Sequence, residues 1–349
     1  MIFEERKRIS PEQALEMLKS KDIISLGKLA HKVRTEKHEN KTYYIVNQHI
    51  NYTNVCINGC KFCAFSQKEG SPNAITMTLD EIESKTESFN PRVSELHIVG
   101  GCHPSLPYKY YIEMLEKLHS KHPEVHLQAF TAVEIAHIAE IGKRTVKETL
   151  KDLKKAGLGS IPGGGAEVFS PRVRSQVCEE KLSGEKWLEV MRIAHKLGIR
   201  SNATMLYGHV ETDEEIVDHL VKLRNLQDET GGFLSFIPLP YHPFNTPMGG
   251  QGLTPGVRDI QVFTTARVFL DNFDHIKAFW IMLTPKFAQV LLHFGANDFD
   301  GTVVEEKITH SAGAKTPQAM DIEEIHHLIR SAGFVPIERD TLYNIKSKI

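Results

Sequence analysis

The sequence predicts an α/β protein, a (β/α)8 TIM-type barrel with an N-terminal helical extension. From Tyr43 onward, short apolar or β-branched runs alternate with longer amphipathic stretches, the pattern of repeated βα units around a parallel sheet. Glycine follows two of these stretches, at Gly157 and Gly198, where helices are expected to end. A chain of 349 residues is long enough for one such barrel as a single domain.

Residues 1–40 are expected to form the helical extension, and residues 41–349 the barrel domain, which ends in a C-terminal helix and strand. The stretch SPEQ at residues 10–13 resembles a capped helix start. Apolar residues follow at helical spacing, beginning with Leu15 and Leu18.

Strands are expected where the runs are short and rich in β-branched or aromatic residues. They fall at residues 43–47, 95–99, 126–130, 159–161, 201–206, 233–237 and 275–281, with a weak candidate at 294–297. Helices are expected at residues 78–89, 108–121, 145–155, 183–196, 212–230, 256–271 and 322–332. Several of them open with Ser or Thr, which are favoured N-cap residues.

The eighth unit is the weakest part of the pattern, because residues 285–298 mix a short helical stretch with a loop. Eight strands would complete a barrel, and a partial barrel of six units is the alternative. Residues 247–256 (PMGGQGLTPG) are expected to form a long surface loop able to cover an active site.

The composition is that of an ordinary globular protein, 41% hydrophobic and 25% charged with a formal net charge of −2. This charge argues against a nucleic-acid-binding surface. The N-terminus is charged and lacks the apolar core of a signal peptide, and the sequence contains no run of about 18 apolar residues. We therefore expect a cytoplasmic protein that acts on a small molecule and neither binds nucleic acid nor spans a membrane.

Three of the five cysteines stand within eight residues, which does not suit a disulfide framework. Cys56, Cys60 and Cys63 have the spacing C-x3-C-x2-C and follow the first expected strand, where barrel enzymes carry active-site loops. Three thiolates can hold an iron–sulfur cluster and leave one iron open to another ligand. A zinc knuckle completed by His49 or His103 is the alternative.

This spacing, with the aromatic Phe62 before the third cysteine, resembles the signature of radical S-adenosylmethionine (SAM) enzymes. The resemblance implies that Cys56, Cys60 and Cys63 hold a 4Fe-4S cluster and that SAM chelates its open iron. It also implies that an electron from the cluster splits SAM into methionine and a 5′-deoxyadenosyl radical, with flavodoxin or ferredoxin as electron donor. Phe62 is expected to shield the cluster.

Glycine runs follow two expected strands. Gly100 and Gly101 end the second strand, and their missing side chains allow the backbone to approach a ligand. By the resemblance, this place receives the SAM amino group. Glu167 follows the triple glycine at residues 163–165, and we expect it to bind the SAM amino group or ribose. Plain turns are the alternative at both places.

Asn202 and Thr204 alternate along the fifth expected strand, so both point to one face, which we expect to be the lumen. A buried polar pair needs partners, supplied either by the cofactor or by a core network. The two remaining cysteines, Cys102 and Cys178, lack a neighbour at metal-ligand spacing in the sequence and are interpreted as ordinary thiols.

Several basic side chains follow expected strand ends or the glycine run. His103 and His209 are candidate catalytic residues, and His242 a candidate substrate-binding residue. Arg172 and Arg174 could pair with an anionic substrate. A solvated loop surface is the alternative for the two arginines.

Four blocks resemble one branch of radical SAM enzymes, that of the menaquinone futalosine pathway and its deazaflavin-synthase relatives. They are HIVGGCHP (97–104), GSIPGGGAEVFSPRVR (159–174), NATMLYGHVET (202–212) and FGANDFDGTVVEEKI (294–308). Within the branch they are most similar to aminofutalosine synthases. Cys102 departs from the apolar residue expected at its position.

The resemblance implies that SAM is a consumed co-substrate. The deoxyadenosyl radical would add to 3-[(1-carboxyvinyl)oxy]benzoate and give 6-amino-6-deoxyfutalosine, methionine and bicarbonate, in menaquinone biosynthesis. Dehypoxanthine futalosine cyclase and a deazaflavin-synthase-like enzyme are the alternatives. An iron–sulfur electron carrier or a zinc-binding module would be the non-enzymatic ones.

Overall fold

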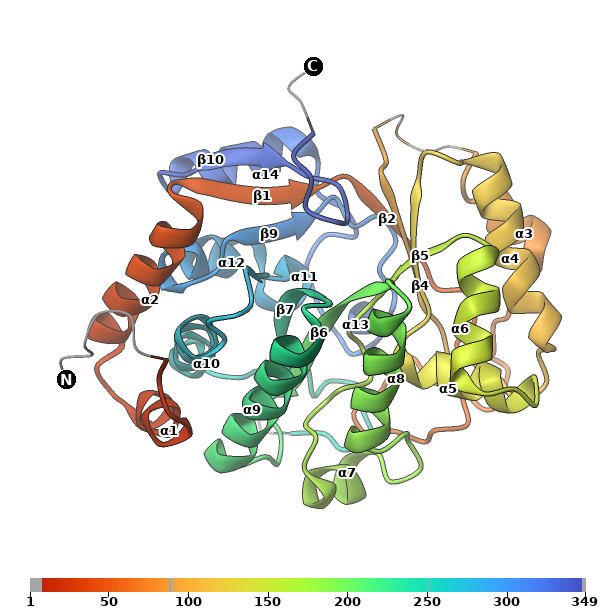
Figure 1. The fold of residues 1–349 in the computed structure, drawn as a ribbon, viewed down its shortest axis with the longest axis horizontal. Coiled ribbons are helices and arrows are strands. Elements are labelled where there is room, and N and C mark those ends of the chain that lie inside the picture. Colours follow the sequence, from red (N-terminus) through yellow and green to blue (C-terminus); the bar gives the residue numbers. More distant parts are fainter. Residues whose placement is uncertain (1–7, 88–89, 91, 251, 347–349) are drawn as a thin grey trace.

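The structure is a computed structural model that describes residues 8–87, 90, 92–250 and 252–346 (Figure 1). Its strands are β1 (Lys41–Ile45), β2 (Asn47–Ile50), β3 (Glu95–Ile98), β4 (His126–Ala129), β5 (Leu158–Ile161), β6 (Arg200–Tyr207), β7 (Phe233–Pro240), β8 (His275–Ile276), β9 (Asp298–Gly301) and β10 (Val335–Glu338). The expected first strand, 43–47, straddles β1 and β2, which Val46 separates.

Seven strands form one curled parallel sheet in the order β2-β3-β4-β5-β6-β7-β8, and a second parallel sheet has the order β10-β1-β9. Single parallel bridges, Gln48↔Val304 and Lys277↔Asp298, join the two sheets. Thus β9 lies next to β8 around the lumen. The expected parallel α/β fold of TIM type is confirmed as a partial barrel, in which these bridges replace a continuous eighth ladder.

Helices cover the outside of the curled sheet (Figure 1). They are α3 (Leu79–Ser84), α4 (Tyr108–Lys121), α5 (Ala132–Ile141), α6 (Val146–Lys155), α7 (Pro171–Val177), α8 (Gly184–Lys196), α9 (Asp213–Thr230) and α10 (Gly256–Phe269). Shorter helices follow near the C-terminal end: α11 (Trp280–Leu283), α12 (Pro285–Leu291), η1 (Leu292–Phe294), α13 (Ile308–Ser311) and α14 (Ile322–Ser331). The last part of the expected helix 78–89, residues 88–89, lies outside the described residues.

Capping explains why most helix starts could be predicted. Four helices begin with a capping box, in which the threonine side chain accepts a hydrogen bond from the backbone N–H three residues later. The glutamate at that later position accepts one from the backbone N–H of the threonine. The four threonines are Thr78, Thr131, Thr145 and Thr212. Each such box satisfies N–H groups that a helix start leaves without a partner. At the other end, Gly157 and Gly198 follow α6 and α8 with φ of 117° and 73°, which favours glycine.

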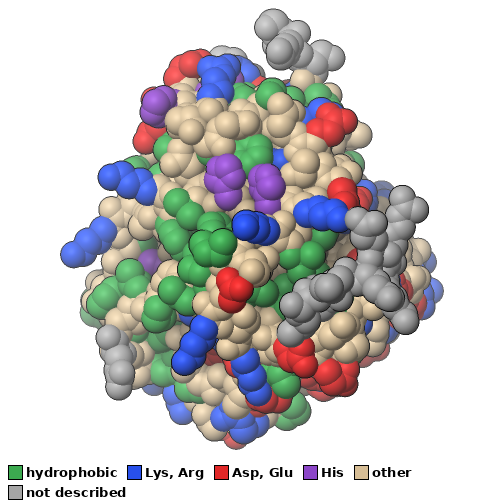
Figure 2. Space-filling model, turned by 90° about the vertical axis from the view of Figure 1, so that its left-hand side faces the viewer, with side chains coloured by type: hydrophobic (Ala, Val, Ile, Leu, Met, Phe, Trp, Pro, Cys, Tyr) green, Lys and Arg blue, Asp and Glu red, His purple; other side chains and the backbone are tan. Residues whose placement is uncertain are grey.

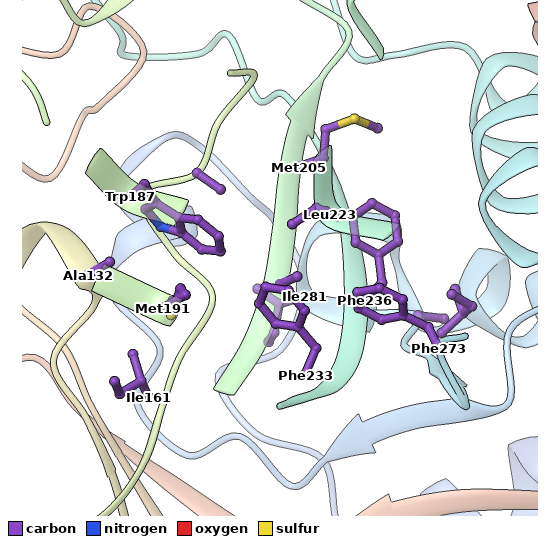
Figure 3. Close-up of a cluster of buried hydrophobic side chains, with 14 of the residues drawn as sticks. Ala132, Ile161, Trp187, Met191, Met205, Leu223, Phe233, Phe236, Phe273 and Ile281 are labelled. Carbon is purple, nitrogen blue, oxygen red and sulfur yellow. The ribbon is translucent and has the colours of Figure 1, made fainter. Parts of the chain in front are cut away.

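The main core lies between the sheet and these outer helices (Figure 3). Trp187 and Met191 of α8 face Phe233 of β7, and all three are nearly fully buried. The Trp187 and Phe233 rings stack with their centroids 6.2 Å apart. Burial of large aromatic side chains of this kind stabilises the fold by roughly 2–3 kcal/mol each, so it fixes α8 against the sheet.

Two N-terminal helices, α1 (Pro11–Lys19) and α2 (Ile23–His38), pack on α10 beside the second sheet (Figure 1). On the face that Figure 2 shows, acidic and basic side chains are interspersed around a central group of hydrophobic and histidine side chains. Among the described residues, no helix is long and apolar enough to cross a membrane.

Two expected strands differ from the structure. Of the expected strand 275–281, only His275–Ile276 is a strand, and its end lies in α11. The weak candidate 294–297 is wrong, because the strand is Asp298–Gly301 and Phe294 closes a 3-10 helix. These strands span two and four residues, too few for an alternating pattern to mark their position.

Candidate functional site

The three clustered cysteines lie on the loop that follows β2, here called the cysteine loop, residues 56–63. The backbone N–H of Ile57 donates to the Cys102 carbonyl over 3.1 Å, and that of Lys61 to the Val177 carbonyl over 2.9 Å. The loop is therefore tied to the end of β3 and to the end of α7. Gly59, with φ of 53°, allows the sharp turn in its middle.

The cysteine loop borders a cavity of about 330 Å³ inside the barrel. All of the expected cluster and cofactor residues line it: Cys56, Cys60, Phe62, Cys63, Gly100, Gly101, Glu167, Asn202 and Thr204, together with His242. Apart from Asn202 and Thr204, these residues follow strand ends, so the carboxyl ends of the strands form this part of the wall. This is the end at which barrel enzymes carry their active sites.

The cysteines differ in their electrostatic surroundings. The pKa of Cys56 is lowered to about 5, chiefly by a hydrogen bond from the Cys102 side chain. Burial raises the pKa of Cys60 to about 12 and also raises that of Cys63. Since metal binding needs thiolates, loading of an iron–sulfur cluster here would release protons.

The thiols do not form a ready site for one metal ion. Within the described residues, no group of three or more His, Cys, Asp or Glu side chains converges on a single metal position. A zinc knuckle requires such convergence around one ion, whereas a 4Fe-4S cluster takes each thiolate on a different iron. The cavity beside the loop and the three thiols around it fit the cluster.

Gly100 and Gly101 serve the cysteine loop directly. A Cβ at Gly101 would lie 2.2 Å from the Val55 carbonyl oxygen and 2.9 Å from the Cys56 Cβ. A Cβ at Gly100 would lie 2.8 Å from the Tyr52 ring. The missing side chains therefore allow the segment from Tyr52 to Cys56, which leads into the cysteine loop, to pack on the end of β3. The sequence did not indicate this role.

Glu167 forms a buried ion pair with Lys181, whose Nζ lies 2.6 Å from Oε1 of the carboxylate. Lys181 also lies 5.3 Å from the centre of the Phe62 ring. Its pKa is raised well above the ordinary value by the charges of Glu167 and Cys60, which outweigh burial. The Lys181 ammonium thus contacts both Glu167, on the loop after β5, and Phe62, on the cysteine loop.

Asn202 and Thr204 point into the lumen, and both have protein partners. The Thr204 hydroxyl donates to the Gly163 carbonyl over 2.7 Å. The Asn202 amide donates to Gln128 Oε1 over 3.4 Å and accepts from the Ser235 hydroxyl over 2.9 Å. Both side chains therefore belong to a satisfied network that faces the cavity.

Four expected site residues have side chains engaged away from the cavity lining. His209 Nε2 bonds the Leu206 carbonyl at 2.9 Å, and His103 Nδ1 accepts from the Ser105 N–H at 3.1 Å. Arg172 is bound to Glu215 at the surface. Arg174 is buried, and its guanidinium donates hydrogen bonds to the backbone carbonyls of Ala166 and Leu182. None of the four lines the cavity in the structure, and their catalytic and substrate-binding roles stay predictions.

His242 does line the cavity, where its Nε2 bonds the Met282 carbonyl at 2.9 Å. The two thiols interpreted as ordinary lie beside the cysteine loop. The Asn58 amide donates to Cys102 Sγ over 3.3 Å, and Cys178 is close enough to Cys60 to raise its pKa. Their distance from the motif in the sequence concealed this.

Further polar residues of the cavity were missed from the sequence. Glu134 accepts from the Gly100 N–H at 2.9 Å and the Tyr52 hydroxyl at 2.8 Å, and burial raises its pKa to about 7. Deeper in the lumen lies a set here called the lumen floor: His49, His97, Gln128, Asn202, Lys277 and Asp300. Of these six, Asn202 is the one that the sequence predicted to face the lumen. Polar residues at alternate positions of β2 and β3 were the available signal.

A parallel half-barrel with three thiols on the loop after its first strand is the architecture of radical SAM enzymes. The Radical SAM superfamily model matches residues 50–223, and the CofH/MqnC C-terminal region matches residues 230–349. The chain belongs to the radical SAM superfamily, whose enzymes use a 4Fe-4S cluster and SAM. It is a radical SAM enzyme of the transferase type.

The relatives narrow this class to one branch. The aminodeoxyfutalosine synthase of Thermus thermophilus is 45% identical over 97% of this chain and 92% of that protein. The enzyme of the same name from Streptomyces coelicolor is 41% identical over 97% and 91%. The 5-amino-6-(D-ribitylamino)uracil–L-tyrosine 4-hydroxyphenyl transferase of Methanopyrus kandleri is 39% identical over 95% and 91%.

Solved structures share the fold. Methylornithine synthase (PylB) superimposes with a TM-score of 0.77, 15% identity and coverage of 95% of both chains. The FeFe-hydrogenase maturase HydG from Carboxydothermus hydrogenoformans gives a TM-score of 0.73 at 16% identity, over 97% of this chain and 78% of that one.

Proposed function

We propose that this chain is an aminodeoxyfutalosine-forming radical SAM enzyme of menaquinone biosynthesis. The observation that carries the proposal is the similarity, at 45% and 41% identity and nearly full length, to two aminodeoxyfutalosine synthases. The substrate would be 3-[(1-carboxyvinyl)oxy]benzoate. The products would be 6-amino-6-deoxyfutalosine, methionine and bicarbonate, with SAM consumed as a co-substrate.

Cys56, Cys60 and Cys63 would hold the 4Fe-4S cluster, which supplies the electron that divides SAM into methionine and a 5′-deoxyadenosyl radical. Support comes from the motif, from its loop at the cavity wall and from the packing of that loop on Gly101. Phe62 would keep water from the cluster. Exclusion of water protects a reactive radical from side reactions.

Gly100, Gly101 and Glu167 would position SAM. The backbone of the two glycines and the Glu167 carboxylate all face the cavity beside the cysteine loop. Glu167 carries a charge matched by Lys181, so the pair offers an acceptor for an amino group and a donor for a carboxylate. Asn202 and Thr204 would complete the wall, and His242 would contact the substrate.

We also infer the setting in which this chemistry takes place. Residues 41–349 would act as one barrel domain, with residues 1–40 as a helical extension that braces α10. A flavodoxin or ferredoxin would reduce the cluster. Five free cysteines and an oxygen-sensitive cluster suit the reducing cytoplasm.

A second candidate function is the transfer of a 4-hydroxyphenyl group from L-tyrosine to 5-amino-6-(D-ribitylamino)uracil. The observation that favours it is the group of archaeal relatives of that name at 38–39% identity over 91–97% of the chain. A transfer that began with hydrogen abstraction by the deoxyadenosyl radical would release free 5′-deoxyadenosine, whereas the addition proposed for the synthase reaction retains the group in the product. The fate of this group therefore separates the two functions.

The test uses the reconstituted enzyme under anaerobic conditions, with a reductant and SAM labelled in the adenosyl group. With 3-[(1-carboxyvinyl)oxy]benzoate, we expect the label in a larger product and little free 5′-deoxyadenosine. Parallel reactions contain L-tyrosine with 5-amino-6-(D-ribitylamino)uracil, or dehypoxanthine futalosine. Stoichiometric 5′-deoxyadenosine without an adduct, together with turnover of either alternative substrate, would transfer the assignment to that reaction.

A further inference from the structure

The lumen floor is a group of polar side chains that line the cavity from several strands. His49 and His97 belong to β2 and β3, Gln128 to β4 and Asp300 to β9, and Lys277 directly follows β8. The cysteine loop, Gly100, Gly101 and Glu167 instead come after the strands. The floor therefore lies deeper in the same cavity than the proposed cofactor residues.

His49 is the member of the floor with free hydrogen-bonding capacity. The residue is only 6% exposed and lines the cavity. Its ring stacks on His97 with centroids 4.5 Å apart. Among the hydrogen bonds of the described residues, none involves its ring nitrogens, and neither nitrogen is sealed from the cavity. A buried polar group of this kind needs a partner, which a ligand in the cavity would supply.

The neighbouring floor residues hold His49 in place and mostly satisfy one another. His97 Nδ1 bonds Gln128 Oε1 at 3.1 Å, and Asn202 donates to the same oxygen. Because that oxygen only accepts, His97 Nδ1 carries the proton. Lys277 Nζ bonds Asp300 Oδ1 at 2.9 Å, which engages one of the three N–H donors of the ammonium group.

The charges of the floor favour a neutral donor at His49. Burial lowers the pKa of both imidazoles, and Lys277 lowers it further, so both rings are neutral near pH 7. Lys277 faces two carboxylates, Asp300 and Glu95, and the Glu95 carboxylate accepts from the Asn47 amide at 3.3 Å. Among the six floor residues, the donors left for a ligand are the imidazole N–H of His49 and the ammonium of Lys277.

We propose that the lumen floor is the subsite for the substrate carboxylate that lies away from SAM, with His49 as its direct hydrogen-bond donor and Lys277 as its cation. The inference rests on the proposed function, in which the substrate carries two carboxylates and reacts at its enol ether. The ring carboxylate survives the reaction, so it can anchor the substrate throughout. This subsite would set specificity, because a ring without the carboxylate leaves the His49 imidazole without an acceptor.

The test measures binding without turnover. The reconstituted enzyme with SAM, but without reductant, is titrated anaerobically by calorimetry with 3-[(1-carboxyvinyl)oxy]benzoate and with its ring carboxamide. Hydrogen bonds to a charged group contribute about 1.5–3 kcal/mol, so the wild-type enzyme should prefer the carboxylate by about 10- to 100-fold. His49→Ala should lose most of this preference, and His49→Gln, which keeps a donor, should retain part of it.

The matched control is His195→Gln. His195 is a partly buried imidazole outside the cavity lining, bonded to the Thr230 and Ser201 hydroxyls at 2.7 and 2.8 Å. It should keep the full carboxylate preference. SAM affinity and iron content should be unchanged in both His49 variants, which excludes a general loss of folding.

The outcomes separate the subsite from the proposed function. If His49→Ala weakens both ligands equally, or weakens neither, the subsite is wrong, whatever the products of the reduced enzyme. If the carboxylate preference depends on His49 but the reduced enzyme forms no adduct, the subsite stands and the synthase function fails. Absence of binding to the wild-type enzyme overturns both, and tight binding of L-tyrosine that depends on Asp300 would assign the floor to an ammonium group.

Discussion

The backbone N–H of Cys102 donates a hydrogen bond to the Cys56 sulfur over 3.4 Å, linking the end of β3 to the cysteine loop. The Asn58 amide donates to the Cys102 sulfur over 3.3 Å. The Cys102 sulfur is therefore an acceptor toward Asn58, and its S–H donates to the Cys56 sulfur. A proposed cluster ligand thus receives donors from both the backbone and the side chain of one residue.

Cys102→Ala should lower the reduction potential of the cluster without reducing iron content. Donors to a ligand sulfur stabilise the more negative, reduced cluster, and the substitution removes the side-chain donor but leaves the backbone N–H. Cys102→Ser should show a smaller shift, since a hydroxyl still donates. Redox titration followed by electron paramagnetic resonance measures the potential, and identical potentials in all three proteins would assign Cys102 a packing role only.

Replacement of Cys56, Cys60 or Cys63 by Ala should abolish the cluster. Each substitution removes one of only three proposed thiolate ligands, and iron–sulfur clusters are not retained by two. Iron and sulfide content after anaerobic reconstitution measures the effect. Cys178→Ala is the matched control, because that thiol is buried beside Cys60 but is not a proposed ligand. Normal iron content in Cys60→Ala would contradict the assignment.

Gly101→Ala should displace the cysteine loop and lower cluster content several-fold. The new Cβ would meet the Val55 carbonyl oxygen at 2.2 Å, a backbone atom that cannot move without the loop. Gly70→Ala, on the segment between the cysteine loop and α3, serves as the control, because its Cβ would enter open space. In this control variant, the only expected cost is the backbone strain of a non-glycine residue at φ of 77°, about 1 kcal/mol of stability. Equal iron content in the two variants would show that the loop adapts.

The sequence predicted most of the fold because its signals are local. Serine or threonine caps marked α6, α8 and α9, glycine stops marked the ends of α6 and α8, and β-branched runs marked β3 to β7. Helix α5 was missed although Thr131 caps it, because most of its side chains are buried and its sequence lacks a polar face. β8 and β9 were misplaced because pairing with neighbouring strands, rather than their own pattern, sets their positions.

In the candidate site, too, local sequence signals were predictable and contacts between distant residues were not. The cysteine motif is contiguous, so the sequence indicated the loop and the chemistry together. His49 and Lys277 are separated by more than two hundred residues and come together only through the closure of the barrel. His209 follows a strand end, but its imidazole is hydrogen-bonded to the Leu206 carbonyl and does not line the cavity, and its catalytic role stays a prediction. Position after a strand is therefore not enough to place a side chain in the lumen.

Lys181→Met should destabilise the protein and weaken SAM binding together. The Lys181 ammonium and the Glu167 carboxylate are 12% and 10% exposed at a separation of 2.6 Å. Removal of one partner leaves the other charge buried and unpaired, which typically costs about 3–5 kcal/mol. If Glu167 positions SAM, the single substitution also disturbs its carboxylate. Urea unfolding and calorimetric SAM titration of the unreduced, reconstituted enzyme measure the two effects separately.

The double variant Lys181→Met, Glu167→Gln distinguishes a structural pair from a cofactor-binding one. Without either charge, no unpaired charge is buried, so the free energy of unfolding should return most of the way to the wild-type value. SAM affinity should not recover, because the proposed acceptor for the SAM amino group remains absent. Lys19→Met removes a surface cation that is paired with Glu214, and it should change neither quantity measurably. Recovery of SAM affinity in the double variant would remove Glu167 from the proposed SAM site and leave the pair a role in folding alone.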